Sequence, residues 1–123
     1  RNNGGPYSTV AAAGWAAIDP THLAVTLTLS TGRALITFTG NVYASIGLHL
    51  SLDVDIDGAR LGGADGIARV YADSTTRPVS FAVLRAGLTE GAHTFTLVWK
   101  ASADTAYLHA DSTLLAHFAV AEW

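Results

Sequence analysis

Three aspartates at alternate positions in one stretch of this chain are the residues most suited to hold a metal ion. Asp53, Asp55 and Asp57 are followed by a glycine, and a calcium loop of the EF-hand type begins with this pattern. Such a loop ends with a bidentate Glu at its twelfth position, which is Ala64 here. The spacing therefore does not predict an EF-hand. A looser calcium site that uses Asp57 and Asp65 is the alternative left open.

The same stretch, residues 47–58, also alternates apolar and polar residues one by one. Period two predicts a β-strand with one face in a core and the other face outside, and Asp57-Gly58 is a dipeptide suited to the turn that follows. Three carboxylates on one strand face repel each other. We therefore expect solvent, an arginine or a cation to relieve the repulsion.

The five histidines have no close metal-binding spacing. His93 is in phase with the apolar residues of 93–99, which predicts a buried, hydrogen-bonded histidine at the start of a strand. His109 and His117 flank a turn and would face each other if their strands were paired. A zinc or nickel site between those two histidines is the second metal alternative.

Signals for catalysis are absent from the local sequence. There is no cysteine, no Gly-x-Ser-x-Gly motif, and no Lys-Ser/Thr after the glycines of 62–66. The strand aspartates are expected to face solvent and so to lack the desolvated acid that glycoside hydrolysis needs. A Ser-His-Asp triad stays open because its members can be distant in the chain. We predict a non-enzymatic protein without catalytic residues or cofactors.

Composition limits the partners. The chain has 123 residues, a net charge of −3 and only 14% charged residues, which indicates one domain with no basic patch for nucleic acid. No apolar run approaches the ~18–20 residues of a membrane span, so no membrane insertion is predicted. Soluble domains carry about 25% charged residues. The low charge therefore predicts a surface partly covered by other subunits.

Alternation recurs along the whole chain, with turns at regular intervals and no helical pattern. The prediction is an all-β fold, a jelly-roll sandwich of about eight to nine antiparallel strands. Residues 1–14 are expected to be an N-terminal arm or a short strand, and residues 15–123 a single jelly-roll domain. The candidate strands cover residues 7–10, 22–29, 34–40, 47–58, 67–71, 79–83, 93–99, 106–110 and 117–122.

Several segments spread over residues 15–122 resemble one kind of domain. They include Gly91-Ala92-His93-Thr94-Phe95, Leu97-Val98-Trp99-Lys100 and His117-Phe118-Ala119-Val120-Ala121-Glu122. This pattern is similar to a C-terminal domain of phage structural proteins and bacterial surface proteins, a trimeric jelly roll of the tumour necrosis factor type.

The resemblance implies a self-trimerising structural protein of a virion or an extracellular surface. Such a protein would act as capsid decoration or as the tip of a fibre, with itself and major capsid or fibre proteins as partners. Aromatic residues on an outer face would then lie at the threefold axis. The candidates for this trimer interface are Trp99, Tyr107, Phe118 and Trp123.

The sequence leaves two alternative functions open. One is a carbohydrate-binding or receptor-binding module that recognises a host-surface glycan, for which exposed aromatics beside charged residues are needed. Its candidate ligand-binding residues are Trp15, Tyr43, Arg69, Tyr71 and Asp73. The other is an extracellular filament subunit, in which the strand 7–10 completes the sheet of a neighbouring subunit.

Overall fold

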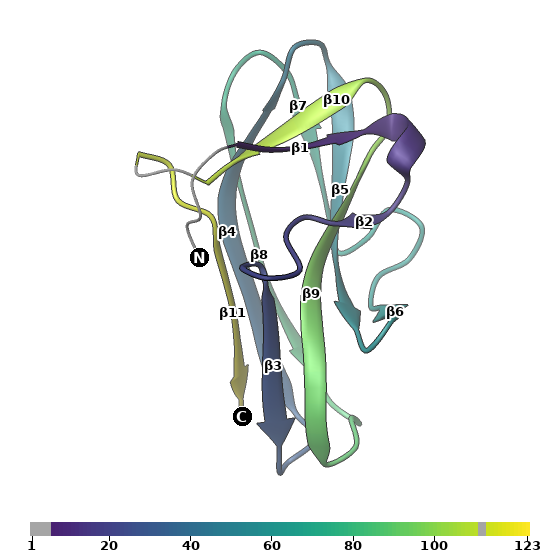
Figure 1. Ribbon diagram of the computed structural model, residues 1–123, viewed down its shortest axis with the longest axis vertical. Helices are drawn as coiled ribbons and strands as arrows, with labels where there is room; N and C mark the ends of the chain where they lie inside the picture. Colours follow the sequence, from purple (N-terminus) through teal and green to yellow (C-terminus); the bar gives the residue numbers. More distant parts are fainter. Residues whose placement is uncertain (1–5, 111–112) are drawn as a thin grey trace.

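The computed structural model describes residues 6–110 and 113–123, which form two antiparallel sheets packed face to face (Figure 1). The predicted all-β jelly-roll sandwich is confirmed. The strands are β1 Pro6–Val10, β2 Ala16–Ala17, β3 Ala24–Leu29, β4 Ala34–Ala44, β5 Leu48–Ile56, β6 Ala59–Arg60, β7 Ala68–Ala72, β8 Arg77–Arg85, β9 Gly91–Ala101, β10 Thr105–His109 and β11 His117–Glu122.

In the first sheet, β4 is the central strand. β8 pairs with one edge of β4, and β11 and β10 pair one after the other with its opposite edge. β1 pairs with the outer edge of β10. β8 is thus an edge strand, and its Pro78 has no N–H to donate to a second neighbour.

In the second sheet, β9 and β5 lie side by side at the centre. β2 and β3 pair with the outer edge of β9, and β6 and β7 pair with the outer edge of β5. The chain passes between the two sheets at β1–β2, β3–β4, β4–β5, β7–β8, β8–β9 and β9–β10. This repeated crossing is the jelly-roll topology.

The core lies between the sheets and is built from alternate residues of the long strands. Phe38 of β4, Leu52 of β5, and Phe95 and Trp99 of β9 are buried there. Each such side chain contributes about 1.5–3 kcal/mol of hydrophobic free energy relative to an exposed one. The period-two pattern of the sequence is therefore the pattern of inward-facing residues.

The structure has eleven strands in its described part, and the two beyond the predicted nine are β2 and β6. Each has only two residues, too few to show a period. β6 lies in the glycine-rich segment 59–66, which none of the predicted strands covers. It follows a two-residue turn in which Asp57 and Gly58 both have positive φ, 54° and 97°. This conformation matches the twist of a hairpin.

β4 also continues past Gly40, where the sequence predicts its end. A Cβ at Gly40 would lie 2.7 Å from the ring of Phe38 and 3.0 Å from a methyl group of Leu108. This glycine is required by packing inside a strand rather than by a turn. A glycine that fits a crowded core and one that ends a strand look alike in sequence.

The N-terminal segment from residue 6 onward is part of the sandwich. All five residues of β1 pair with β10 of the same chain, and a 3-10 turn over Ala11–Ala13 follows, with the Ala11 N–H donating to the carbonyl of Asp104. Within the described residues of the predicted arm or short strand, Pro6–Val10 is a strand of the first sheet. Residues 1–5 lie outside the described part.

No helix in the described part has the length and apolar character needed to cross a membrane.

Candidate functional site

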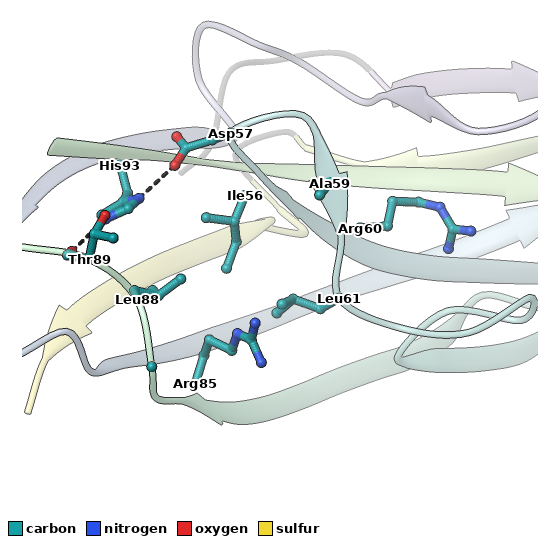
Figure 2. Close-up of a pocket in the computed structure, with 10 residues that line it drawn as sticks. Ile56, Asp57, Ala59, Arg60, Leu61, Arg85, Leu88, Thr89 and His93 are labelled. Carbon is teal, nitrogen blue, oxygen red and sulfur yellow. Dashed lines mark hydrogen bonds and ion pairs between the residues drawn. The ribbon is translucent and has the colours of Figure 1, made fainter.

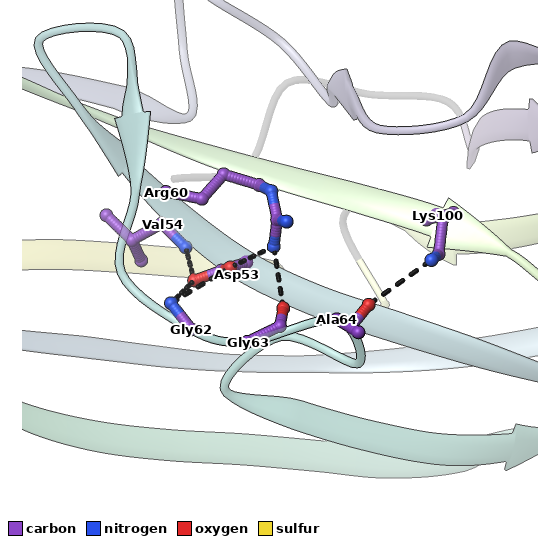
Figure 3. A network of polar contacts seen from close by, with 7 residues as sticks. All are labelled: Asp53, Val54, Arg60, Gly62, Gly63, Ala64 and Lys100. Atoms are coloured by element: carbon purple, nitrogen blue, oxygen red, sulfur yellow. Dashed lines mark hydrogen bonds and ion pairs between the residues drawn. The ribbon is translucent and has the colours of Figure 1, made fainter.

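The segment 59–66, which we call the excursion, folds back over the outer face of β5 and covers Asp53 (Figure 3). The Asp53 side chain is 0% exposed. Its carboxylate accepts hydrogen bonds from the Arg60 guanidinium at 2.7 Å and from the backbone N–H of Gly62 and Val54 at 3.0 and 2.7 Å. The prediction that Asp53 faces solvent is wrong. Of the three ways expected to relieve the repulsion between the carboxylates, which were solvent, an arginine and a cation, Asp53 has the arginine, Arg60.

The excursion also positions Trp15. The guanidinium of Arg60 lies 4.2 Å from the Trp15 ring centroid and the ammonium of Lys100 lies 5.1 Å from it, both within the range of cation–π attraction. Lys100 donates in addition to the carbonyl of Ala64. Trp15 is thereby held at the edge of a groove of about 500 Å³, whose other walls are Ala16, Ala17, Pro20, Asp55, Arg60, Thr96 and Val98.

His93 is buried at the start of β9, as predicted, and both of its ring nitrogens face acceptors. Nδ1 lies 2.5 Å from a carboxylate oxygen of Asp57, and Nε2 lies 2.8 Å from the carbonyl oxygen of Thr89. Because neither acceptor has a proton to give, only the imidazolium, with both nitrogens protonated, satisfies both contacts. The hydrogen bonds to Thr89 and Asp57 raise the pKa of His93. The hydrogen bonds from the Thr94 N–H and from His93 lower the pKa of Asp57.

Asp57, His93 and Thr89 resemble a triad in composition but lack its chemistry. The Thr89 hydroxyl lies 3.4 Å from Nε2 of His93, but that nitrogen donates to the Thr89 carbonyl and has no lone pair to take a proton. A general base needs that lone pair. The arrangement instead ties the β5–β6 turn, the loop before β9 and β9 itself together.

This ion pair predicts a pH dependence of stability. The folded-state pKa of His93 lies above 6.5, so its contribution is complete below pH 6.5 and is lost as the pH rises through the raised pKa. The folded-state pKa of Asp57 lies below 3.8, so its contribution is present above pH 3.8 and is lost as the pH falls through the lowered pKa. We expect the difference in Tm between the wild type and His93→Gln to be largest between these limits and to shrink above pH 6.5. Thermal unfolding at a series of pH values measures it. A difference that grows with alkaline pH would contradict the imidazolium.

A second polar cluster, missed by the sequence analysis, fixes the segment between β2 and β3. Asp19 is only partly exposed, and it accepts hydrogen bonds from the Tyr7 hydroxyl at 2.7 Å and from the backbone N–H groups of Thr21 and His22. Burial raises the pKa of Asp19, but the hydrogen bonds from Tyr7, His22 and Thr21 outweigh it and hold the pKa well below its usual range. An aspartate two residues before a backbone donor is the local signal that identifies such a turn.

The predicted metal ligands are not brought together. One carboxylate oxygen of Asp57 accepts a hydrogen bond from His93 and the other accepts one from the Thr94 N–H. Asp65 is exposed on the excursion. No group of three or more His, Asp or Glu residues within residues 6–110 and 113–123 could hold a metal ion. His109 and His117 lie on β10 and β11, which both pair with β4 and not with each other. The predicted facing of these two histidines is therefore wrong.

The predicted ligand-binding residues lie in separate places. Tyr43 is on the first sheet, where its ring stacks on Tyr107 at 4.8 Å and on His109 at 4.7 Å. Arg69 and Tyr71 are exposed on β7 of the second sheet, and the Tyr71 ring meets His49 edge-on. Asp73 lies beyond β7 and pairs with Arg77 at 2.9 Å. Trp15 lies in the groove described above. Only Trp15 therefore has charged residues around it in a concave site.

The predicted interface aromatics also separate. Trp99 and Phe118 belong to the core of the single chain and are 2% and 6% exposed, so the prediction that they lie on an outer face is wrong. Both are in phase with inward-facing residues of their strands. Tyr107 and Trp123 are accessible. Trp123 is 41% exposed, and the Arg33 guanidinium lies 5.3 Å from its ring centroid.

Charge is distributed unequally over the two outer faces of the sandwich. The second sheet carries Asp55, Arg69 and Lys100 in addition to the covered Asp53. The outward-facing residues of β8, β4 and β11, which we call the uncharged face, include no Asp, Glu, Lys or Arg. They are Pro78, Ser80, Ala82 and Leu84 of β8, Leu35, Thr37, Thr39, Asn41 and Tyr43 of β4, and His117, Ala119 and Ala121 of β11.

Comparisons with known proteins add no functional information. A scan against protein-family models, a search of curated proteins and a search of solved structures each return no match to this chain.

Proposed function

We propose that this protein is a non-enzymatic structural module that assembles with copies of itself into a trimer through the uncharged face. The observation that carries the proposal is the absence of charge from a wide, accessible sheet face. Leu84 on this face is 61% exposed, the most exposed of the large apolar side chains in the described part of the chain. The cores of subunit interfaces are depleted of charged residues in the same way.

The composition of the face suits association of flat surfaces. Across the three strands, Thr37 lies between Ala82 and Ala119, and Leu35 lies between Leu84 and Ala121. Small and apolar side chains in these rows let a second backbone approach closely. β8 also exposes an unpaired edge, and its Pro78 lacks the N–H that would extend the sheet by strand pairing. Packing of this face against a different surface of the neighbouring subunit, as a threefold ring requires, is thus favoured over edge-to-edge strand pairing.

A trimeric jelly roll would act in the setting that the sequence resemblance implies, as a decoration on a capsid or as the tip of a fibre. Strand donation by residues 7–10 is less well supported, because β1 occupies the edge of its own β10. A donated strand would need that edge open. The proposal is accordingly a closed assembly of whole domains.

We expect Thr37→Arg to convert the assembly to monomers. An arginine at the centre of the uncharged face would have to be buried without a counter-charge at each interface, and such burial costs several kcal/mol. The measurement is the native mass by light scattering and native mass spectrometry. The expected masses are three times 12.8 kDa for the wild type and 12.8 kDa for the variant.

Thr28→Arg is the matched control. Thr28 is an exposed threonine on the outward side of β3 in the second sheet, so the same substitution there leaves the mass unchanged. A wild type that is monomeric at high concentration would overturn the proposal. So would a Thr37→Arg variant that keeps the wild-type mass and Tm.

Glycan binding is a second candidate, and the groove at Trp15 favours it. An aromatic ring, the Asp55 carboxylate, the Thr96 hydroxyl and the Arg60 guanidinium line one concave surface of about 500 Å³. Orientation of a ligand by a few polar groups on a largely apolar wall is usual for small-molecule sites.

A glycan array with the wild type and two variants tests this candidate. We expect Trp15→Ala to lower any specific signal by at least about tenfold, on the order of 1.4 kcal/mol. Tyr71→Ala, which removes an exposed aromatic outside the groove, is expected to leave the signal unchanged. Equal signals for the two variants would rule the groove out.

A further inference from the structure

A cavity of about 280 Å³ opens at one end of the sandwich, where the β5–β6 turn, the end of β8 and the loop before β9 meet (Figure 2). At ~30 Å³ for each water in the liquid, this is the space of roughly nine water molecules. Ile56, Leu61 and Leu88 form apolar walls. Leu61 comes from the excursion and Leu88 from the loop, so the cavity exists only once the chain is folded.

Arg85 supplies a charge at this cavity. It pairs with Ala34 on β4, whose side chain is fully buried, so Arg85 occupies an inward-facing position at the end of β8. Figure 2 shows its guanidinium directed from β8 toward Leu61 and Ile56. It forms no hydrogen bond or ion pair with the residues that the structure describes. Arg85 is exposed to solvent, so its guanidinium is accessible to an anion that enters the cavity.

The other charged groups of the cavity are already paired. Asp57 is bound to His93 and to the Thr94 N–H, and Arg60 is bound to Asp53. The cation of His93 is therefore offset by Asp57, and that of Arg60 by Asp53. The positive charge of Arg85 is the one left for a ligand to neutralise.

We propose that this cavity binds a small monocarboxylate with a short apolar tail. The planar guanidinium of Arg85 offers two parallel N–H donors, which match a carboxylate in bidentate geometry. The tail would lie against Ile56, Leu61 and Leu88. The site belongs to one chain, so Thr37→Arg is expected to bind the ligand as the wild type does, and a failure of the trimer proposal leaves this one standing.

Hexanoate is the probe, titrated into the ¹⁵N-labelled full chain and followed by NMR. We expect saturable shifts at the amides of Gly87, Leu88 and Thr89 and at the Arg85 Nε–H. Acetate lacks four of the methylene groups and is expected to bind more weakly, by about fourfold for each methylene that hexanoate buries. Arg85→Gln is expected to weaken hexanoate binding by at least about tenfold.

Three controls make the result decisive. Arg69→Gln removes an exposed arginine on the second sheet and is expected to keep the affinity within about twofold. Arg85→Lys, which keeps the charge but not the planar fork, is expected to bind between the wild type and Arg85→Gln. The Tm of each variant confirms folding, since Arg85 is exposed at a strand end.

Several outcomes would overturn the proposal. Hexan-1-ol binding as tightly as hexanoate would show an apolar cavity in which Arg85 plays no part. Unchanged affinity in Arg85→Gln, or shifts that never saturate, would show non-specific contact. A peptide ending in a free leucine carboxylate that binds more tightly than hexanoate would assign the site to a chain terminus instead of a free acid.

Discussion

Trp99→Ala is expected to lower the free energy of unfolding by about 3–5 kcal/mol, the range found when a large buried aromatic is truncated. Trp99 is 2% exposed on β9, between β2 on one side and β5 on the other, and it heads the large side chains that are fully buried. Its removal leaves a cavity that rigid strands on both sides fill only partly. Domains of this size have about 5–15 kcal/mol of stability in total, so the variant would be close to unfolding.

Chemical denaturation followed by circular dichroism measures this loss. Trp123→Ala is the control. Because Trp123 is exposed at the end of β11, its removal is expected to change the free energy of unfolding by no more than about 0.5 kcal/mol, unless another subunit covers it. If Trp99→Ala instead left stability intact and changed only the native mass, Trp99 would be an interface residue and its burial in the core would be wrong.

Asp53→Ala is expected to cost about 2–4 kcal/mol. The substitution removes the acceptor for three donors, the Arg60 guanidinium and the N–H groups of Gly62 and Val54. Loss of one partner of a buried ion pair typically costs 3–5 kcal/mol. The lower end of the range applies here because the Arg60 side chain is 28% exposed and is partly stabilised by water and by Trp15.

The control for this prediction is Asp65→Ala, an exposed aspartate of the same excursion, with an expected effect within about 0.5 kcal/mol. The double variant Asp53→Ala/Arg60→Ala is expected to be more stable than the sum of the single variants predicts, because it no longer leaves the guanidinium without its carboxylate. Urea denaturation gives all four free energies. Strict additivity would mean that the two residues do not interact.

Much of the fold was predictable because alternation is a local property. Leu48, Leu50, Leu52, Val54 and Ile56 all face the core, as their period two predicts, and the Asp57-Gly58 turn follows where expected. Two-residue strands such as β2 and β6 were not predictable, because two residues carry no period. The end of β4 was wrongly predicted at Gly40. This glycine is required by the close approach of Phe38 and Leu108, which only the folded structure shows.

The candidate sites were less predictable than the fold. The burial and hydrogen bonding of His93 followed from its phase in β9, and Trp15 was a candidate on residue type. Its charged neighbour Arg60 comes from the excursion, which the sequence describes only as an irregular glycine-rich stretch. Arg85 carried no signal at all, since one arginine at a strand end looks like another until the opposite sheet is in place.

By itself, the sequence determined which residues lie in strands and which side of each strand is apolar, because backbone geometry alone makes successive side chains point to opposite faces. Only the tertiary structure decided what covers the polar side. The excursion buries Asp53, β8 and β11 complete an uncharged face on both sides of β4, and the loop at Leu88 lines a cavity beside Arg85. The uncharged face joins segments far apart in the chain, and the excursion and the loop at Leu88 carry no regular sequence period from which their positions could be predicted.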